Sequence, residues 1–165
     1  MITIAGIIYI ALPYSLLSFL LFPGINGDAQ FYPWILIGIF IIIWIYDSMA
    51  YVFGSWLGKH KICERISPKK SWEGLIGGAV FAVITSVVIS NFFHELGITD
   101  WIVISLLIVS FGTSGDFFES KLKREAGVKD SGSILPGHGG MLDRFDTVLF
   151  AIPVIFVWIY LFGNI

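Results

Sequence analysis

The sequence predicts an all-α integral membrane protein with about five transmembrane helices. Of its 165 residues, 56% are hydrophobic and only 13% are charged, whereas soluble domains carry roughly 25% charged residues. Apolar runs of nearly spanning length recur along the chain. The runs are continuous, whereas the strands of a membrane barrel alternate apolar and polar residues, so we expect helices.

The apolar runs predict five helices within a single membrane domain, residues 1–165. A span needs about 20 largely apolar residues. The first run has Pro13 in its middle and lacks the basic start and small-residue cleavage site of a signal peptide, so we expect a kinked spanning helix. The fourth run reaches spanning length only by tilting or by including Asp116. The predicted spans are residues 2–22, 33–50, 74–93, 101–115 and 147–163.

The basic residues predict the orientation of the chain. Five lie between the second and third spans and five between the fourth and fifth, and the alternate connections contain none. Because Lys and Arg accumulate on the cytoplasmic side, we expect both basic loops and the N-terminus to lie inside. The ten residues are Lys59, Lys61, Arg65, Lys69, Lys70, Lys121, Lys123, Arg124, Lys129 and Arg144.

Carboxylates accompany the basic residues of the second basic loop. Asp116 and Glu119 are three residues apart, as are Asp143 and Asp146, so each pair can share one helix face at the membrane surface. Such pairs suit a hard cation such as Mg²⁺, which takes one or two carboxylates together with phosphate oxygens. A solvated loop of mixed charge is the alternative.

A glycine-rich stretch, LPGHGGM at residues 135–141, lies between the two acidic pairs. Gly139 and Gly140 can bring backbone N–H groups close to a ligand, although glycine turns are also common between helices. His138 could bind phosphate, donate a proton or cap a helix.

The first basic loop contains ISPKKSWEG, residues 66–74. Ser67 and Pro68 fit an N-cap and a first helical position. Lys69 and Lys70 would then lie in the first turn, where positive charge opposes the helix dipole unless an anion binds there. The alternative is that these lysines only anchor the span on the inside.

Two features of the second span concern function and packing. Asp47 ends the run, and an acidic residue at a membrane boundary is a functional candidate by default. Ala50, Gly54 and Gly58 recur every four residues, a pattern that favours close helix packing.

Residues 120–146, SKLKREAGVKDSGSILPGHGGMLDRFD, resemble the signature of the CDP-diacylglycerol synthases, or phosphatidate cytidylyltransferases. The segments GDFFES, SPKKSWEGLIGG and DSMAYVFGSWLGKHK are also similar to family segments, so the resemblance covers about residues 44–165. Family members are usually longer, so we expect a short family form or the C-terminal catalytic half. The constrained positions filled here are Ser120, Lys123, Arg124, Lys129, Asp130, Gly132, Leu135, Pro136, His138, Gly139, Gly140, Asp143, Arg144 and Asp146.

The resemblance implies that CTP and phosphatidic acid react to give CDP-diacylglycerol and pyrophosphate, with Mg²⁺ as cofactor and no nucleic-acid partner. Asp116 and Asp143 are the first candidates for metal ligands, with Asp146 and Glu119 as further ligands or orienting groups. Ser120 and Asp130 are candidates for the cytosine pocket, and Gly139 and Gly140 for the triphosphate. The candidates for binding phosphate or assisting the reaction are Lys69, Lys70, Lys123, Arg124, Lys129, His138 and Arg144.

Two alternatives remain beside this interpretation. One is a CTP-dependent lipid kinase of the dolichol or phytol kinase type, and the other is an inactive, truncated membrane module. A CDP-alcohol phosphotransferase is disfavoured because its D-G-x-x-A-R pattern is absent. We expect a bacterial cytoplasmic membrane protein with its site facing the cytoplasm, and a homodimer is plausible.

Overall fold

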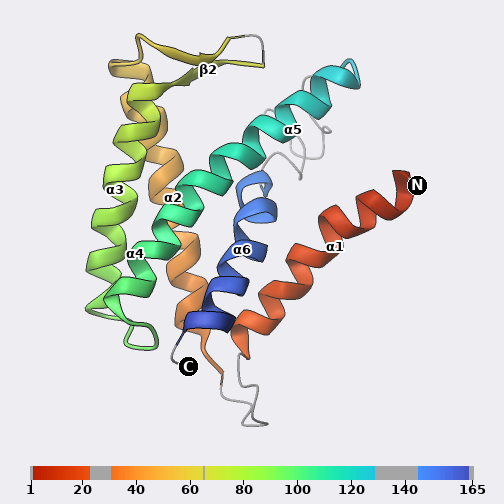
Figure 1. Ribbon diagram of the computed structural model, residues 1–165. Helices are drawn as coiled ribbons and strands as arrows, with labels where there is room; N and C mark the ends of the chain where they lie inside the picture. Colours follow the sequence, from red (N-terminus) through yellow and green to blue (C-terminus); the bar gives the residue numbers. More distant parts are fainter. Residues whose placement is uncertain (1, 23–30, 65, 129–144, 164–165) are drawn as a thin grey trace, which may run out of the picture.

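The computed structural model of the chain describes residues 2–22, 31–64, 66–128 and 145–163 (Figure 1). It confirms the predicted helical fold class, and each of the five predicted spans falls on a helix. The long helix from Ile98 to Glu125 is continuous and contains Asp116, which is one of the two ways in which the fourth run could reach spanning length. The elements are α1 (Ile2–Leu21), α2 (Pro33–Trp56), β1 (Lys61–Cys63), β2 (Ser67–Ser71), α3 (Trp72–Ser90), α4 (Ile98–Leu107), a π-helical turn η1 (Ile108–Gly112), α5 (Thr113–Glu125) and α6 (Asp146–Phe162).

Three of the described helices are long and apolar enough to cross a membrane. They are α2 with 24 residues, α3 with 19, and the 28-residue helix Ile98–Glu125. The apolar part of α1 (Ile8–Leu21) and the whole of α6 are shorter. At a rise of 1.5 Å per residue, α6 is about 26 Å long, slightly less than the roughly 30 Å of a hydrocarbon core.

The loop before α3 differs from the prediction, because residues 61–63 and 67–71 pair as the antiparallel strands β1 and β2 of a hairpin. The helix does not begin at Ser67 and Pro68 but at Trp72. Ser71, with extended backbone (φ −128°, ψ 155°), is the N-cap, and its Oγ accepts a hydrogen bond from the Gly74 N–H at 3.2 Å. Lys69 and Lys70 therefore lie in β2, and the predicted conflict with the helix dipole does not arise.

The contact between α2 and α3 is the most extensive between helices, and small residues make it close. A Cβ added at Gly74 would lie 2.7 Å from the carbonyl oxygen of Ala50 and 3.0 Å from the Cα of Gly54. This confirms the packing role predicted for Ala50 and Gly54. Gly58 lies beyond the end of α2, and a Cβ there would lie 2.7 Å from Ser71 Oγ.

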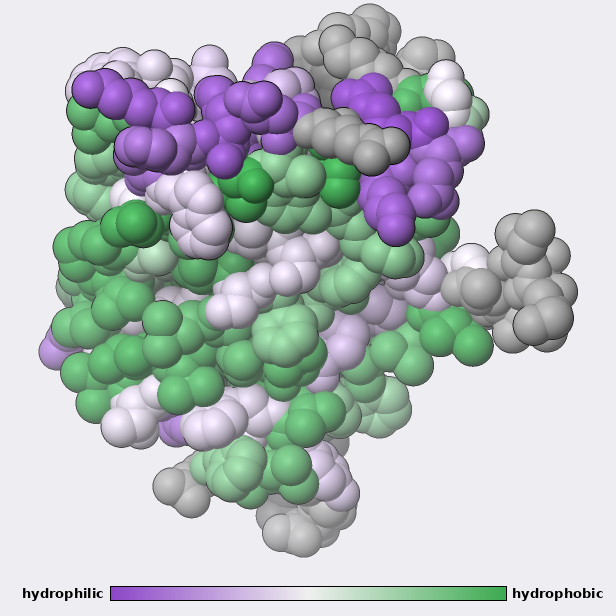
Figure 2. Space-filling model, turned by 45° about the horizontal axis from the view of Figure 1, so that its top comes forward, coloured by the Kyte–Doolittle hydropathy of each residue, from purple (hydrophilic) through white to green (hydrophobic). Residues whose placement is uncertain are grey.

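The two basic loops lie at one end of the bundle, insofar as the structure describes them. In Figure 1 the hairpin and the C-terminal end of α5 lie at the top, whereas the C-terminus lies at the bottom. Figure 2 shows hydrophilic residues gathered in a band at that end, above a broad apolar belt. Large apolar side chains of the helices, such as Trp44 on α2 and Ile76 on α3, are exposed, as lipid-facing residues would be.

Candidate active site

A cavity of about 300 Å³ lies at the hairpin end of the bundle. Its walls come from α2, both strands of the hairpin, α3, α5 and α6, so segments far apart in the sequence meet there. Ile62 and Leu75 contribute apolar surface. The charged and hydroxyl-bearing residues among those that line it are Tyr46, Asp47, Tyr51, Lys69, Lys70, Ser71, Thr113, Asp116, Asp146 and Thr147.

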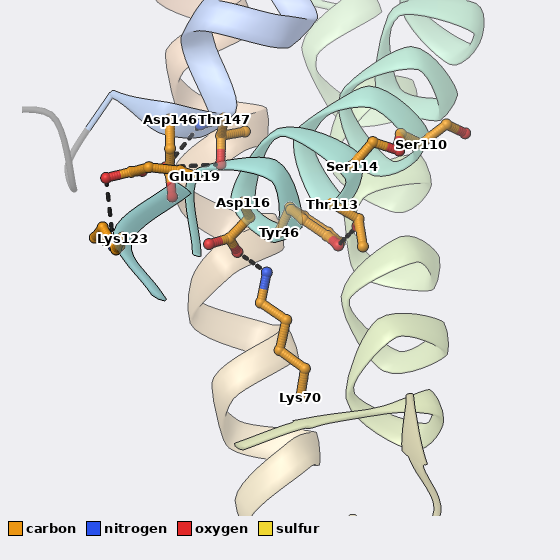
Figure 3. Close-up of polar contacts among 10 residues, drawn as sticks. All are labelled: Tyr46, Lys70, Ser110, Thr113, Ser114, Asp116, Glu119, Lys123, Asp146 and Thr147. Atoms are coloured by element: carbon orange, nitrogen blue, oxygen red, sulfur yellow. Dashed lines mark hydrogen bonds and ion pairs between the residues drawn. The ribbon is translucent and has the colours of Figure 1, made fainter. Parts of the chain in front are cut away.

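An ion pair between Lys70 on β2 and Asp116 on α5 crosses the cavity (Figure 3). The Lys70 ammonium also lies 4.7 Å from the centre of the Phe117 ring, a cation–π contact. The side chains of Lys70 and Asp116 are 25% and 35% exposed, respectively. The hairpin thus delivers a cation to an acidic residue while leaving both open to a ligand.

Asp146 is the first residue of α6, where the helix dipole favours negative charge. Its Oδ1 accepts a hydrogen bond from the Thr147 N–H at 2.7 Å. The Asp146 carboxyl lines the same cavity as that of Asp116, and it is close enough to Asp116 and Glu119 for their charges to interact. We call Asp116, Glu119 and Asp146 the acidic cluster.

Glu119 is the buried member of the acidic cluster, with a side chain only 1% exposed. Lys123 Nζ lies 3.3 Å from its Oε1, one helical turn further along α5 (Figure 3). A buried charge is stable only when it is paired or hydrogen-bonded. Lys123 is therefore held against the acidic cluster.

Tyr46 and Thr113 join α2 to α5 beside the acidic cluster, and neither was a sequence candidate. Their hydroxyl groups are hydrogen-bonded (Figure 3), and Thr113 directly follows the π-helical turn η1. Such turns are frequent at functional sites. No sequence pattern predicts the π-helical turn η1. The signal nearest to Tyr46 is its neighbour Asp47, which was a predicted candidate and does line the cavity.

Besides Asp47, the structure brings four predicted site residues to the cavity, namely Lys69, Lys70, Asp116 and Asp146. Glu119 and Lys123 form the adjacent pair.

Two other predicted residues on α5 do not line the cavity. Ser120 is half-buried. Arg124 is exposed and instead borders a second cavity of about 420 Å³ with Ile66, Lys121 and Glu125. The remaining predicted site residues lie outside the described part of the chain: Lys129, Asp130, His138, Gly139, Gly140, Asp143 and Arg144.

Asp116 and Asp146 are two described carboxylates at the cavity that could hold a metal ion together with a substrate phosphate. Among residues 2–22, 31–64, 66–128 and 145–163, no three His, Cys, Asp or Glu side chains converge on one point. Asp116 and Asp146 do line one cavity, and Mg²⁺ is commonly held by one or two carboxylates while phosphate oxygens and water complete its octahedron. The donor set thus fits a metal ion shared with a phosphate.

Comparison with known proteins gives a consistent set of relatives. A sequence model of the cytidylyltransferase family matches residues 1–162, so the similarity extends over α1 and beyond the motifs that begin near residue 44. The phosphatidate cytidylyltransferase of Staphylococcus haemolyticus (strain JCSC1435) is 39% identical over 153 residues, which are 92% of this chain and 57% of the relative.

Two further relatives with the same name cover 70% of this chain and 45% of their own length. That of Staphylococcus saprophyticus is 45% identical over 118 residues, and that of Staphylococcus aureus (strain COL) is 46% identical over 118 residues. The chain therefore spans about half the length of the curated relatives it matches.

Proposed function

The chain belongs to the cytidylyltransferase family, and we propose that it transfers the cytidylyl group of CTP to phosphatidate, giving CDP-diacylglycerol and pyrophosphate. The three relatives described above are named phosphatidate cytidylyltransferases, which supports this reaction over lipid phosphorylation. The observation that carries the proposal is the cavity in which Lys70, Asp116 and Asp146 meet, at the polar end of apolar helices. A membrane-borne phosphate and a soluble nucleotide can both reach that position.

The reaction makes one phosphorus–oxygen bond and breaks another. A phosphatidate oxygen attacks the α-phosphorus of CTP, and the bond to the bridging oxygen of the β-phosphate breaks, so that pyrophosphate leaves with the electron pair. A phosphomonoester with a second pKa near 6 is largely dianionic at neutral pH, so no strong general base is needed. The main obstacle is the approach of two polyanions.

The basic residues reduce that repulsion. The Lys70 side chain extends from the hairpin to Asp116. Its ammonium group can bind a substrate phosphate there in place of, or together with, the Asp116 carboxylate. Lys69 lines the same cavity, and Lys123 lies beside it on Glu119. Such positioned cations stabilise charge that develops on the leaving pyrophosphate.

Asp116 and Asp146 are the described residues that would hold Mg²⁺. When bound, Mg²⁺ would neutralise phosphate charge and stabilise the leaving group. Asp143, by its spacing from Asp146, is a further predicted ligand outside the described residues. Glu119 acts through Lys123, whose position it fixes.

The proposed setting is a bacterial cytoplasmic membrane with the cavity and the N-terminus on the cytoplasmic side. The hairpin and the end of α5 carry basic residues at one end of the bundle, in agreement with the positive-inside rule. CTP would then enter from the cytosol. A homodimer remains a prediction.

The experiment is a label-transfer assay with the purified chain in vesicles that contain phosphatidate and Mg²⁺. With CTP labelled at the α-phosphorus, label should enter the lipid in step with pyrophosphate release. With CTP labelled at the γ-phosphorus, all label should leave in pyrophosphate. In parallel vesicles that contain an isoprenoid alcohol, transfer of the γ-label to that alcohol would establish the kinase alternative. No transfer, with the longer S. haemolyticus relative active in parallel, would contradict a self-sufficient enzyme.

A further inference from the structure

Tyr9 on α1 places a polar atom in an unusual environment. Its hydroxyl oxygen is buried and has no hydrogen-bond partner among the described residues. Buried hydroxyl groups nearly always find a partner, because an unmet hydrogen bond is costly in a dry environment. Tyr9 also precedes every motif that marked the chain as a family member, so no sequence pattern singled it out.

Aromatic packing fixes the Tyr9 ring. Its centre lies 6.0 Å from that of Phe118 on α5 and 5.8 Å, edge to face, from that of Phe150 on α6. The Phe118 and Phe150 rings also contact each other, with their centres 5.3 Å apart. Because the three rings hold one another, the hydroxyl cannot turn to solvent without breaking this packing.

Two members of the acidic cluster, Glu119 and Asp146, are close enough to the Tyr9 hydroxyl for their charges to act on it. Lys70 approaches the cluster from the hairpin, and Tyr9 approaches it from α1. The hydroxyl donates to neither carboxylate, so its proton is available to another acceptor beside them. In the proposed reaction, the acceptors brought to this cluster are phosphate oxygens.

We propose that Tyr9 is a substrate-binding residue whose hydroxyl donates a hydrogen bond to a phosphate oxygen of a substrate held at the acidic cluster. This inference rests on the proposed function. The acceptor belongs either to the triphosphate of CTP or to the lipid phosphate, and the two sources are separated by measurement.

The test compares Tyr9→Phe with Tyr14→Phe in the whole chain. Both changes remove one hydroxyl from α1, but the Tyr14 ring packs on Phe145 and is 38% exposed. Dissociation constants are measured separately for CTP and for short-chain phosphatidate, with Mg²⁺ present, and thermal unfolding is followed with and without each substrate.

Tyr9→Phe should raise the dissociation constant for one of the two substrates about tenfold or more, as loss of a hydrogen bond to a charged group does. The substrate-free melting temperature should not fall, because no existing hydrogen bond is lost. Tyr14→Phe should leave both dissociation constants unchanged. A weaker CTP complex identifies the triphosphate as the acceptor, and a weaker phosphatidate complex identifies the lipid phosphate.

Wild-type dissociation constants for both substrates in Tyr9→Phe would overturn the inference and leave the proposed function standing. A lower substrate-free melting temperature with unchanged binding would also overturn it and show a structural role. Failure of the wild-type chain to bind either substrate would overturn the proposed function and this inference together.

Discussion

Replacing Lys70 by methionine removes the cation that joins the hairpin to Asp116 while keeping an apolar stem of similar length. A unit charge at ~4 Å from a phosphate contributes about 4 kcal/mol at an effective dielectric constant near 20. Lys70 is 25% exposed and Asp116 35%, so solvent screening reduces this contribution to roughly 2 kcal/mol. Turnover at low substrate, kcat/KM, should therefore fall about 30-fold.

The assay is CDP-diacylglycerol formation in vesicles, with Lys121→Met as the matched control. Lys121 lies on α5 at the same end of the molecule, but it is 62% exposed and pairs with Glu125 only at 3.8 Å. Its removal should change kcat/KM less than twofold. Lys70→Arg should recover part of the lost activity because the charge is kept. Equal activities for Lys70→Met and Lys121→Met, with both proteins folded, would refute the placement of a phosphate beside Lys70.

Two further predictions concern stability, measured as thermal unfolding in detergent. Gly78→Ala should destabilise the bundle by about 1 to 3 kcal/mol, because the new Cβ would lie 2.9 Å from the Tyr46 ring and 3.0 Å from Ala50 Cβ. The control Gly6→Ala, whose new Cβ meets no atom within 4 Å, should be neutral or slightly stabilising. Equal melting temperatures for the two variants would refute the packing argument. Ser71→Ala should lower the free energy of unfolding by about 1 kcal/mol through loss of the N-cap of α3. Ser71→Thr should retain most of that stability. A wild-type melting temperature for Ser71→Ala would show that the cap is dispensable.

The helices and the grouping of the basic loops could be predicted because they depend on properties that a sequence displays directly. Continuous apolar runs of spanning length have few alternatives to helix in lipid. The exclusion of lysine and arginine from alternate connections groups the remaining loops at one end. Both inferences need only composition along the chain.

The hairpin could not be predicted, because local rules pointed to the wrong cap. Ser67 followed by Pro68 fits the start of a helix as well as any dipeptide. The actual start at Trp72 is set by Ser71 and by contacts across the loop, in which the Trp72 N–H donates to the His60 carbonyl oxygen and His60 Nδ1 lies 2.6 Å from Glu73 Oε1. A single-sequence pattern does not contain such pairings.

The different positions of Lys123 and Arg124 on α5 could have been predicted from the sequence alone. At 3.6 residues per turn, Lys123 lies within about 20° of Asp116 around the helix axis, whereas Arg124 lies about 80° away. The structure agrees, since Lys123 pairs with Glu119 and Arg124 borders the second cavity. The resemblance treated both as site residues because both belong to the signature.

The turnover of Asp116→Asn tests most directly whether the cavity is where CTP and phosphatidate react. Asp116 pairs with Lys70 and lines the cavity together with Asp146, and the amide keeps its size while removing the charge that would hold a metal ion. Glu125→Gln is the control, because Glu125 lies on the same helix and is 64% exposed. We predict a loss of at least about 100-fold in kcat for Asp116→Asn and wild-type turnover for Glu125→Gln. Wild-type turnover by folded Asp116→Asn would contradict the account.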